Sequence, residues 1–138
     1  MSFDTVKNYV AGRLKGLGYS ESKSPFNFED APQTEYDRCF IVMPLSGTSD
    51  PDGANLNISI FDRQEWNVFI AFSKSTHSDV IKRDDMLRSV EAIIKDLDNP
   101  SNYSATVELI RYTEWNIEES QNYFLLNIKF DIRDQYTY

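Results

Sequence analysis

The 138-residue sequence has a single cysteine, Cys39, and a single histidine, His77. One cysteine excludes an intrachain disulfide and a cysteine-rich zinc site, and it is typical of a reducing compartment. One histidine leaves little for acid–base catalysis near neutral pH. A nucleophilic site would have to pair His77 with Cys39 or a serine, and we favour a surface histidine and a packed cysteine instead. The sequence therefore predicts a protein that is not an enzyme.

Long hydrophobic runs are absent too, since no apolar stretch approaches the roughly 18–20 residues of a membrane span. The first residues lack the apolar core of a signal peptide, so we expect synthesis and assembly in the cytoplasm. Glycine patterns of nucleotide-binding loops do not occur. Residues 48–59 partly match a calcium loop, but Ser59 stands where the final glutamate ligand belongs. We expect no cofactor, no metal and no contact with a membrane.

Basic residues are few: 14 Lys and Arg oppose 22 Asp and Glu, which gives a net charge of −8. This balance argues against a sequence-reading DNA protein, because neutralising phosphates needs a basic face. Residues 21–62 alone carry 8 acidic and 2 basic side chains. This acidity either keeps the protein soluble or forms a surface that repels DNA or meets a basic partner. The candidate residues are Glu29, Asp30, Glu35, Asp50 and Asp52.

The apolar residues, by contrast, follow clear periods. Spacings of three and four predict a helix over 3–17 that ends at Gly16 and Gly18, and a second over 79–98 that Asn99-Pro100 stops. The second helix has an apolar stripe of Val80, Leu87, Val90, Ile94 and Leu97, flanked by Met86 and Ile93. The polar, proline-containing stretch 19–38 predicts a long loop or arm, with aromatic side chains at Phe26, Phe28 and Tyr36.

Strands account for most of the rest. The apolar run 39–44 predicts a strand buried on both faces, followed by a loop over 45–55. Alternation over 56–60 and 65–73 predicts two strands, with Asp62-Arg63-Gln64 as the turn of a hairpin. A second hairpin pairs 106–115 with 122–133 through the polar connector 116–121, so Trp115 is placed at its tip.

Together these elements predict one α+β domain over residues 1–138, with the order α-β-β-β-α-β-β. Short turns make neighbouring strands antiparallel, so we expect one mainly antiparallel sheet of about five strands with both helices on one face. The second face is apolar as well, because Phe69 and Ala71 oppose Trp66 and Val68 along one strand. Either the arm or another subunit should cover that face, and we favour self-association. The candidate interface residues are Phe26, Phe28, Tyr36, Phe69 and Trp115.

In order, size and texture the chain resembles the tail terminator, or tail completion, proteins of long-tailed bacteriophages. The resemblance runs from the helix SFDTVKNYVAGRLKGL and the arm FNFEDAPQTEYDR through CFIVMP, NLNISIFDRQEWNVFIAF and DDMLRSVEAIIKDL to YFLLNIKFDIR. It implies a structural virion protein at the head–tail junction. Such a protein would form a hexameric ring on the finished tail tube, dock the head connector and let DNA pass through an acidic lumen.

A protein of another class fits the same composition. A small acidic inhibitor or immunity protein would use its negative charge to block a basic site on a nucleic-acid enzyme. It would be monomeric or dimeric, with its acidity gathered on one convex patch, whereas the tail terminator would assemble into a ring. The oligomeric state therefore separates the two hypotheses.

Overall fold

The computed structural model describes residues 3–22, 37–49, 59–74, 79–103, 107–120 and 123–137. The elements follow the order predicted from the sequence. They are α1 (Phe3–Gly16), β1 (Ser20–Glu21), β2 (Cys39–Ser49), β3 (Ser59–Ser73), α2 (Asp79–Leu97), a 3-10 turn (Pro100–Asn102), β4 (Val107–Glu119) and β5 (Tyr123–Thr137).

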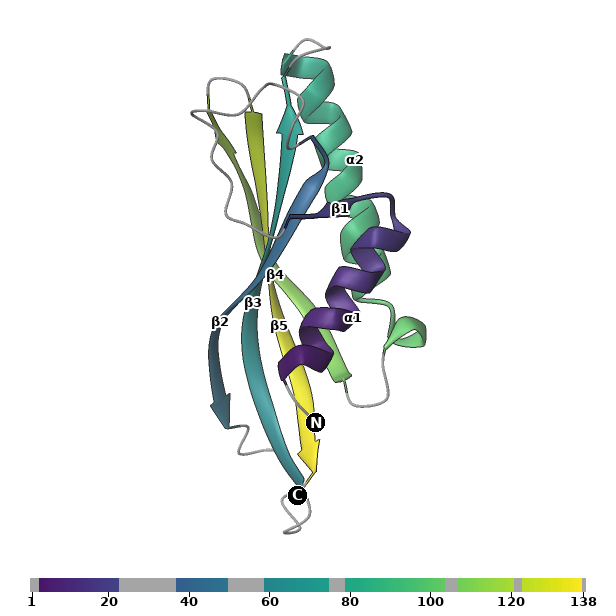
Figure 1. The fold of residues 1–138 in the computed structure, drawn as a ribbon, viewed down its shortest axis with the longest axis vertical. Helices are drawn as coiled ribbons and strands as arrows, with labels where there is room; N and C mark the ends of the chain where they lie inside the picture. The colour runs from purple at the N-terminus through teal and green to yellow at the C-terminus, as the bar shows by residue number, and fades with distance from the viewer. Residues whose placement is uncertain are drawn as a thin grey trace.

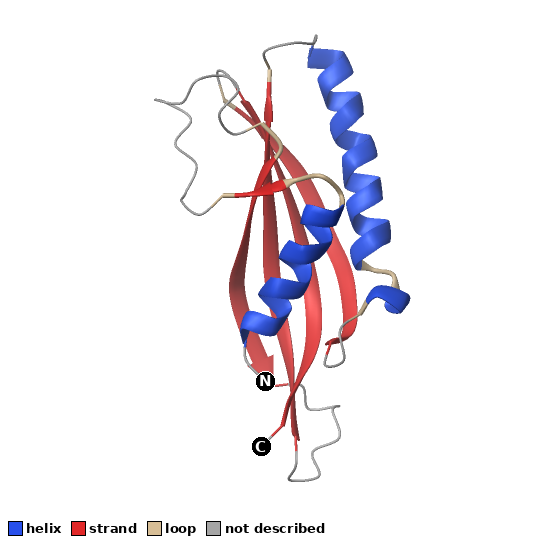
Figure 2. Cartoon of the chain, turned by 45° about the vertical axis from the view of Figure 1, so that its right-hand side comes forward, coloured by secondary structure: helices blue, strands red, loops and turns tan. Residues whose placement is uncertain are grey.

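The strands form one five-stranded sheet in the spatial order β1-β2-β3-β5-β4 (Figure 1). The short β1 runs parallel to β2, and the other neighbours are antiparallel. The sheet is long and strongly twisted, and both helices lie on the same side of it (Figures 1 and 2). The α+β prediction, with a mainly antiparallel sheet and helices on one face, is confirmed.

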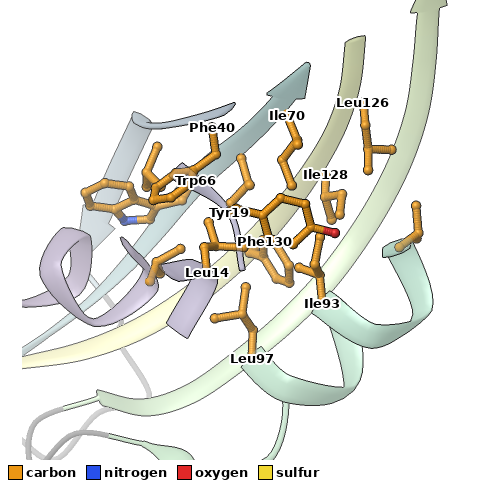
Figure 3. Packing of buried hydrophobic residues seen from close by; sticks show 14 of the residues in the cluster. Leu14, Tyr19, Phe40, Trp66, Ile70, Ile93, Leu97, Leu126, Ile128 and Phe130 are labelled. Carbon is orange, nitrogen blue, oxygen red and sulfur yellow. The ribbon is translucent and has the colours of Figure 1, made fainter. Parts of the chain in front are cut away.

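The face under the helices, here called the inner face, contains the hydrophobic core. Alternate residues of β2, β3 and β5 point into it, and Figure 3 shows these side chains packed against the two helices. The strands contribute Phe40, Val42, Trp66, Val68, Ile70, Phe72, Phe124, Leu126, Ile128, Phe130 and Ile132; the helices contribute Val6, Val10, Leu14, Met86, Val90, Ile93 and Leu97. Burying apolar area on this scale is the main force that holds the helices on the sheet.

The end of α1 follows from the predicted glycine. Gly18 has φ +96°, a left-handed conformation that favours glycine. The amide of Tyr19 donates to the carbonyl of Leu14, and that of Gly18 donates to Lys15, which is the Schellman pattern. This turn sends Tyr19 back into the core and starts β1 at Ser20. The first residues of the predicted arm 19–38, up to Glu21, therefore form a turn and strand β1 instead. Residues 23–36 lie outside the described part.

In α2 the apolar stripe is centred one position away from the predicted one. Met86, Val90, Ile93 and Leu97 are buried, whereas Leu87 is exposed. Because successive helical residues differ by about 100°, a helix packed through Met86 turns Leu87 toward its flank. The bounds of the helix were predicted to within one residue.

The prediction of a hairpin over 56–73 is wrong. β3 is one continuous strand of 15 residues, and Asp62, Arg63 and Gln64 are paired with both β2 and β5. The three polar residues contain neither glycine nor proline, so extended backbone paired on two sides outweighs their turn preference. The Gln64 side chain is itself buried, where its Oε1 accepts a hydrogen bond of 2.7 Å from Trp66 Nε1.

The other strands are longer than predicted. β2 continues through Ser49, where we expected a loop, and β4 continues through Glu119, where we expected a connector. Trp115 therefore lies within a strand, paired with Ile128, rather than at a hairpin tip. The prediction that 39–44 is buried on both faces is also wrong, since Met43 and Pro44 are exposed. The helices cover only the inner face, so the other face of β2 remains accessible.

The two helices are joined by a polar contact at the edge of the core. Arg13 makes two hydrogen bonds of 2.7 Å to the carboxylate of Asp96. Beside this pair, the ring of Tyr9 meets Tyr103 edge to face, with centroids 6.5 Å apart. The Tyr9 hydroxyl is buried without a hydrogen-bond partner. Chiefly through desolvation, its pKa rises from 10.0 to about 12.

Replacing Tyr9 by phenylalanine should leave stability at pH 7 unchanged or raise it by up to about 1 kcal/mol, because a buried hydroxyl without a partner is removed. The wild type should also lose stability between pH 10 and about 12, where the unfolded tyrosine ionises and the folded one keeps its proton. The variant should lose less. Urea denaturation at pH 7 and pH 11 tests both points, with the exposed Tyr112→Phe as control. A clear loss of stability in Tyr9→Phe at pH 7 would show that the hydroxyl has a partner.

Candidate assembly surface

The outer face of the sheet, opposite the helices, carries a compact apolar patch. Strand register places Ile41 beside Phe69 on one row, and Met43 and Leu125 on the rows adjoining it. We call Ile41, Met43, Phe69 and Leu125 the outer patch. Met43 is 48% exposed, and the other three are partly exposed. Neither of the described helices packs on this face (Figure 2).

Two asparagines adjoin the outer patch. Asn67 precedes Phe69 by two residues on β3, and Asn127 is the cross-strand neighbour of Phe69 on β5. Asn67 is only 5% exposed, and the Oδ1 atoms of both side chains are buried without a hydrogen-bond partner. A buried acceptor without a donor costs about 1–3 kcal/mol. Both atoms are closed off from solvent, so this cost falls within the single copy.

Farther along the outer face, the side chains become charged. Glu65 lies opposite Asp131, and Arg63 lies opposite Arg133, so like charges face each other across β3 and β5. Lys129 Nζ lies 2.7 Å from Glu114 Oε1, and this hydrogen bond is the main reason that the pKa of Lys129 is raised. A hollow of about 190 Å³ opens here, lined by Leu45, Glu65, Thr113, Glu114, Lys129, Phe130 and Asp131. The outer face thus divides into an apolar half and a charged half.

A second exposed apolar area lies along β4. Tyr112 and Trp115 are 40% and 39% exposed, although their cross-strand partners Phe130 and Ile128 are buried on the inner face. β4 is the last strand of the sheet, so the two aromatic side chains have a neighbouring strand on one side only. At the end of β4, Glu119 forms ion pairs with Lys74 and Arg83. These pairs link β4 to the end of β3 and to α2.

Only two of the predicted interface residues lie in the described part. Phe69 is on the outer face as expected, and Trp115 is on the inner-face side of an edge strand. Phe26, Phe28, Tyr36, Glu29, Asp30, Glu35, Asp50, Asp52 and His77 lie outside the described residues. Asn67, Asn127 and Tyr112 were not predicted, because only the strand register shows that the asparagines flank Phe69 and that Tyr112 lies on an edge.

Comparison with family models and curated sequences gives no information about this surface. The chain matches no model of a protein family, and no curated protein has a significantly similar sequence. In the described ranges, no three His, Cys, Asp or Glu side chains are grouped so as to hold a metal ion. Neither α1 nor α2 combines the length and the apolar character needed to cross a membrane.

Proposed function

We propose that this chain is a structural virion protein that caps the end of a phage tail tube as an oligomeric ring and joins the tail to the head connector. Its proposed partners are further copies of itself, the tail tube protein and the head connector protein. DNA passes through the ring without being bound in a sequence-specific way. In this proposal the outer patch, with Phe69 at its centre, is a contact between copies.

The outer patch is the observation that carries the proposal. Phe69 and its apolar neighbours are partly accessible on a face that the helices leave open. An accessible apolar area of this kind fits a contact between subunits. The fold class, with two helices on one face of a mainly antiparallel sheet, is as predicted, although the hairpin over 56–73 that formed part of the resemblance to tail terminators is a single strand.

The net charge of −8 fits the same role. An acidic wall would not retain the phosphates of passing DNA, whereas a basic wall would. The acidic stretch between residues 21 and 62 is the natural candidate for that wall, and its placement in the ring is part of the proposal.

Size-exclusion chromatography with light scattering, followed by electron microscopy, tests the proposal directly. The purified chain should form rings of about six copies, or should bind the ends of isolated tail tubes. Mature tails whose ends are already closed serve as the control and should bind no added protein. A chain that stays monomeric at tens of micromolar and ignores open tube ends would contradict the proposal. That result would favour the small acidic inhibitor.

A further inference from the structure

Within the described residues, the sheet has two edges along which no further strand is paired. One is β4 over residues 111–119, because the Tyr103 hydroxyl already bonds the N–H and the C=O of Ile110. The other is β2 from Ile41 to Ser49, because β1 pairs only with Cys39 and Phe40. An open edge presents a row of backbone N–H and C=O groups to any strand that approaches. Each copy of the protein therefore carries two places where a sheet can be extended.

The directions of the two edge strands suit each other. β2 is antiparallel to β3, β3 to β5, and β5 to β4, so β2 and β4 run in opposite directions within one copy (Figure 1). When a second copy is related to the first by rotation about an axis along the strands, its β2 lies antiparallel to the first copy's β4. Antiparallel pairing has the stronger hydrogen-bond geometry.

The side chains favour joining unlike edges. β2 contains no charged residue, and Met43 and Leu45 are about half exposed at its edge. β4 has exposed aromatic rings at Tyr112 and Trp115 but also carries Glu114, Glu118 and Glu119. Glu114 and Glu119 form ion pairs with Lys129, Lys74 and Arg83, so among the described side chains Glu118 is the acidic residue that two β4 strands would bring close together. A neutral strand such as β2 brings no further negative charge to β4.

Both edges are interrupted, and the interruptions limit the pairing. β2 has a register shift between Pro44 and Ser46, and β4 has one between Val107 and Leu109 and another between Tyr112 and Glu114. Pro44 also lacks an N–H to donate. Bulges and proline are common guards against uncontrolled strand addition. The joint is therefore expected to consist of two short ladders, one on each side of the bulges.

We propose that β4 of one copy pairs antiparallel with β2 of a second copy, so that the sheets join head to tail. The inference rests on the proposed function and adds an edge-to-edge contact to the contact at the outer patch. Because the two edges are different surfaces, the contact is heterologous and repeats around a rotation axis. In a closed ring every copy uses both edges, and none is left open to aggregation.

Single lysines at each edge test this contact. Leu45→Lys and Trp115→Lys change side chains that are already partly in water, so both variants should fold, with circular dichroism spectra like that of the wild type. Each should abolish rings, because a lysine at the joint loses its water on pairing. The matched control is Ile81→Lys, an equally exposed apolar residue on α2 that should leave the rings intact.

Mixing the two variants gives the sharper result. Leu45→Lys keeps a normal β4, and Trp115→Lys keeps a normal β2, so together they should form a one-to-one heterodimer that grows no further. Light scattering should show monomers for each variant alone and a mass of two chains for the mixture. If β2 paired with β2, or β4 with β4, the variant that keeps that edge unchanged would form a homodimer by itself.

The outcomes separate this inference from the proposed function. If the wild type forms rings and both lysine variants still do, or if the mixture stays monomeric, the β2–β4 contact is wrong while the ring proposal stands. If the wild type forms no ring and binds no tube end, the proposed function fails and this contact fails with it.

Discussion

Phe69→Asp should convert rings into monomers that remain folded. The side chain lies at the centre of the outer patch, between Ile41 and Asn127, on a face that neither helix covers. In the monomer an aspartate there stays in contact with water and lies near two asparagine side chains. In an interface it would be a buried charge without a partner, which costs several kcal/mol. Association at tens of micromolar should therefore be lost.

Light scattering measures the association, and circular dichroism with urea denaturation measures the fold. Phe69→Leu is the matched control, because it keeps an apolar side chain and should still assemble. The aspartate variant should lose no more than about 2 kcal/mol of stability, as expected for a partly exposed position. If it unfolds outright, Phe69 belongs to the core of the monomer, and the outer patch loses its role as an interface.

Trp66→Ala should destabilise the protein by about 3–5 kcal/mol, the range for removing a large buried aromatic side chain. Trp66 is 2% exposed and lies on the inner face beside Phe130. Its indole N–H is also the donor to the buried Gln64 Oε1, so the substitution leaves a cavity and removes this hydrogen bond. A domain of ordinary stability would be largely unfolded by this change.

Trp115→Ala provides the comparison, since the protein has two tryptophans and this one is 39% exposed. It should cost no more than about 1–2 kcal/mol, because much of its surface is already in water. Urea denaturation followed by circular dichroism compares the two variants without relying on tryptophan fluorescence. Equal losses of stability would mean that the inner face is packed as tightly at β4 as at β3, contrary to the observed exposure.

The helices were predictable because an amphipathic period and a terminal glycine act locally. The strand boundaries were not, because they depend on partners far away in the sequence. Asp62-Arg63-Gln64 has the local composition of a turn, yet β2 and β5 pair with it from both sides. Pairing with β5 likewise extends β4 beyond Trp115 to Glu119, although the polarity of residues 116–121 predicts a connector there.

For the assembly surface, alternation along one strand was enough to place Phe69 on the outer face. It was not enough to show what surrounds Phe69. Asn67 and Asn127 are distant in sequence, and their unmet hydrogen bonds follow from register and burial, which no single strand specifies. Met43 likewise resembles a core residue in CFIVMP and is exposed because it points to the outer face, which the helices leave open.

The pairing of β3 with β5 also determines when the domain can be completed during synthesis. β2 with β3, and β4 with β5, are neighbours along the chain and can form early as separate hairpins. The central pair joins Ser59 to Thr137, so the two hairpins can dock only after β5 has been synthesised. Pairings this distant in sequence form slowly. The outer face, which both hairpins build, therefore forms late, when β3 meets β5.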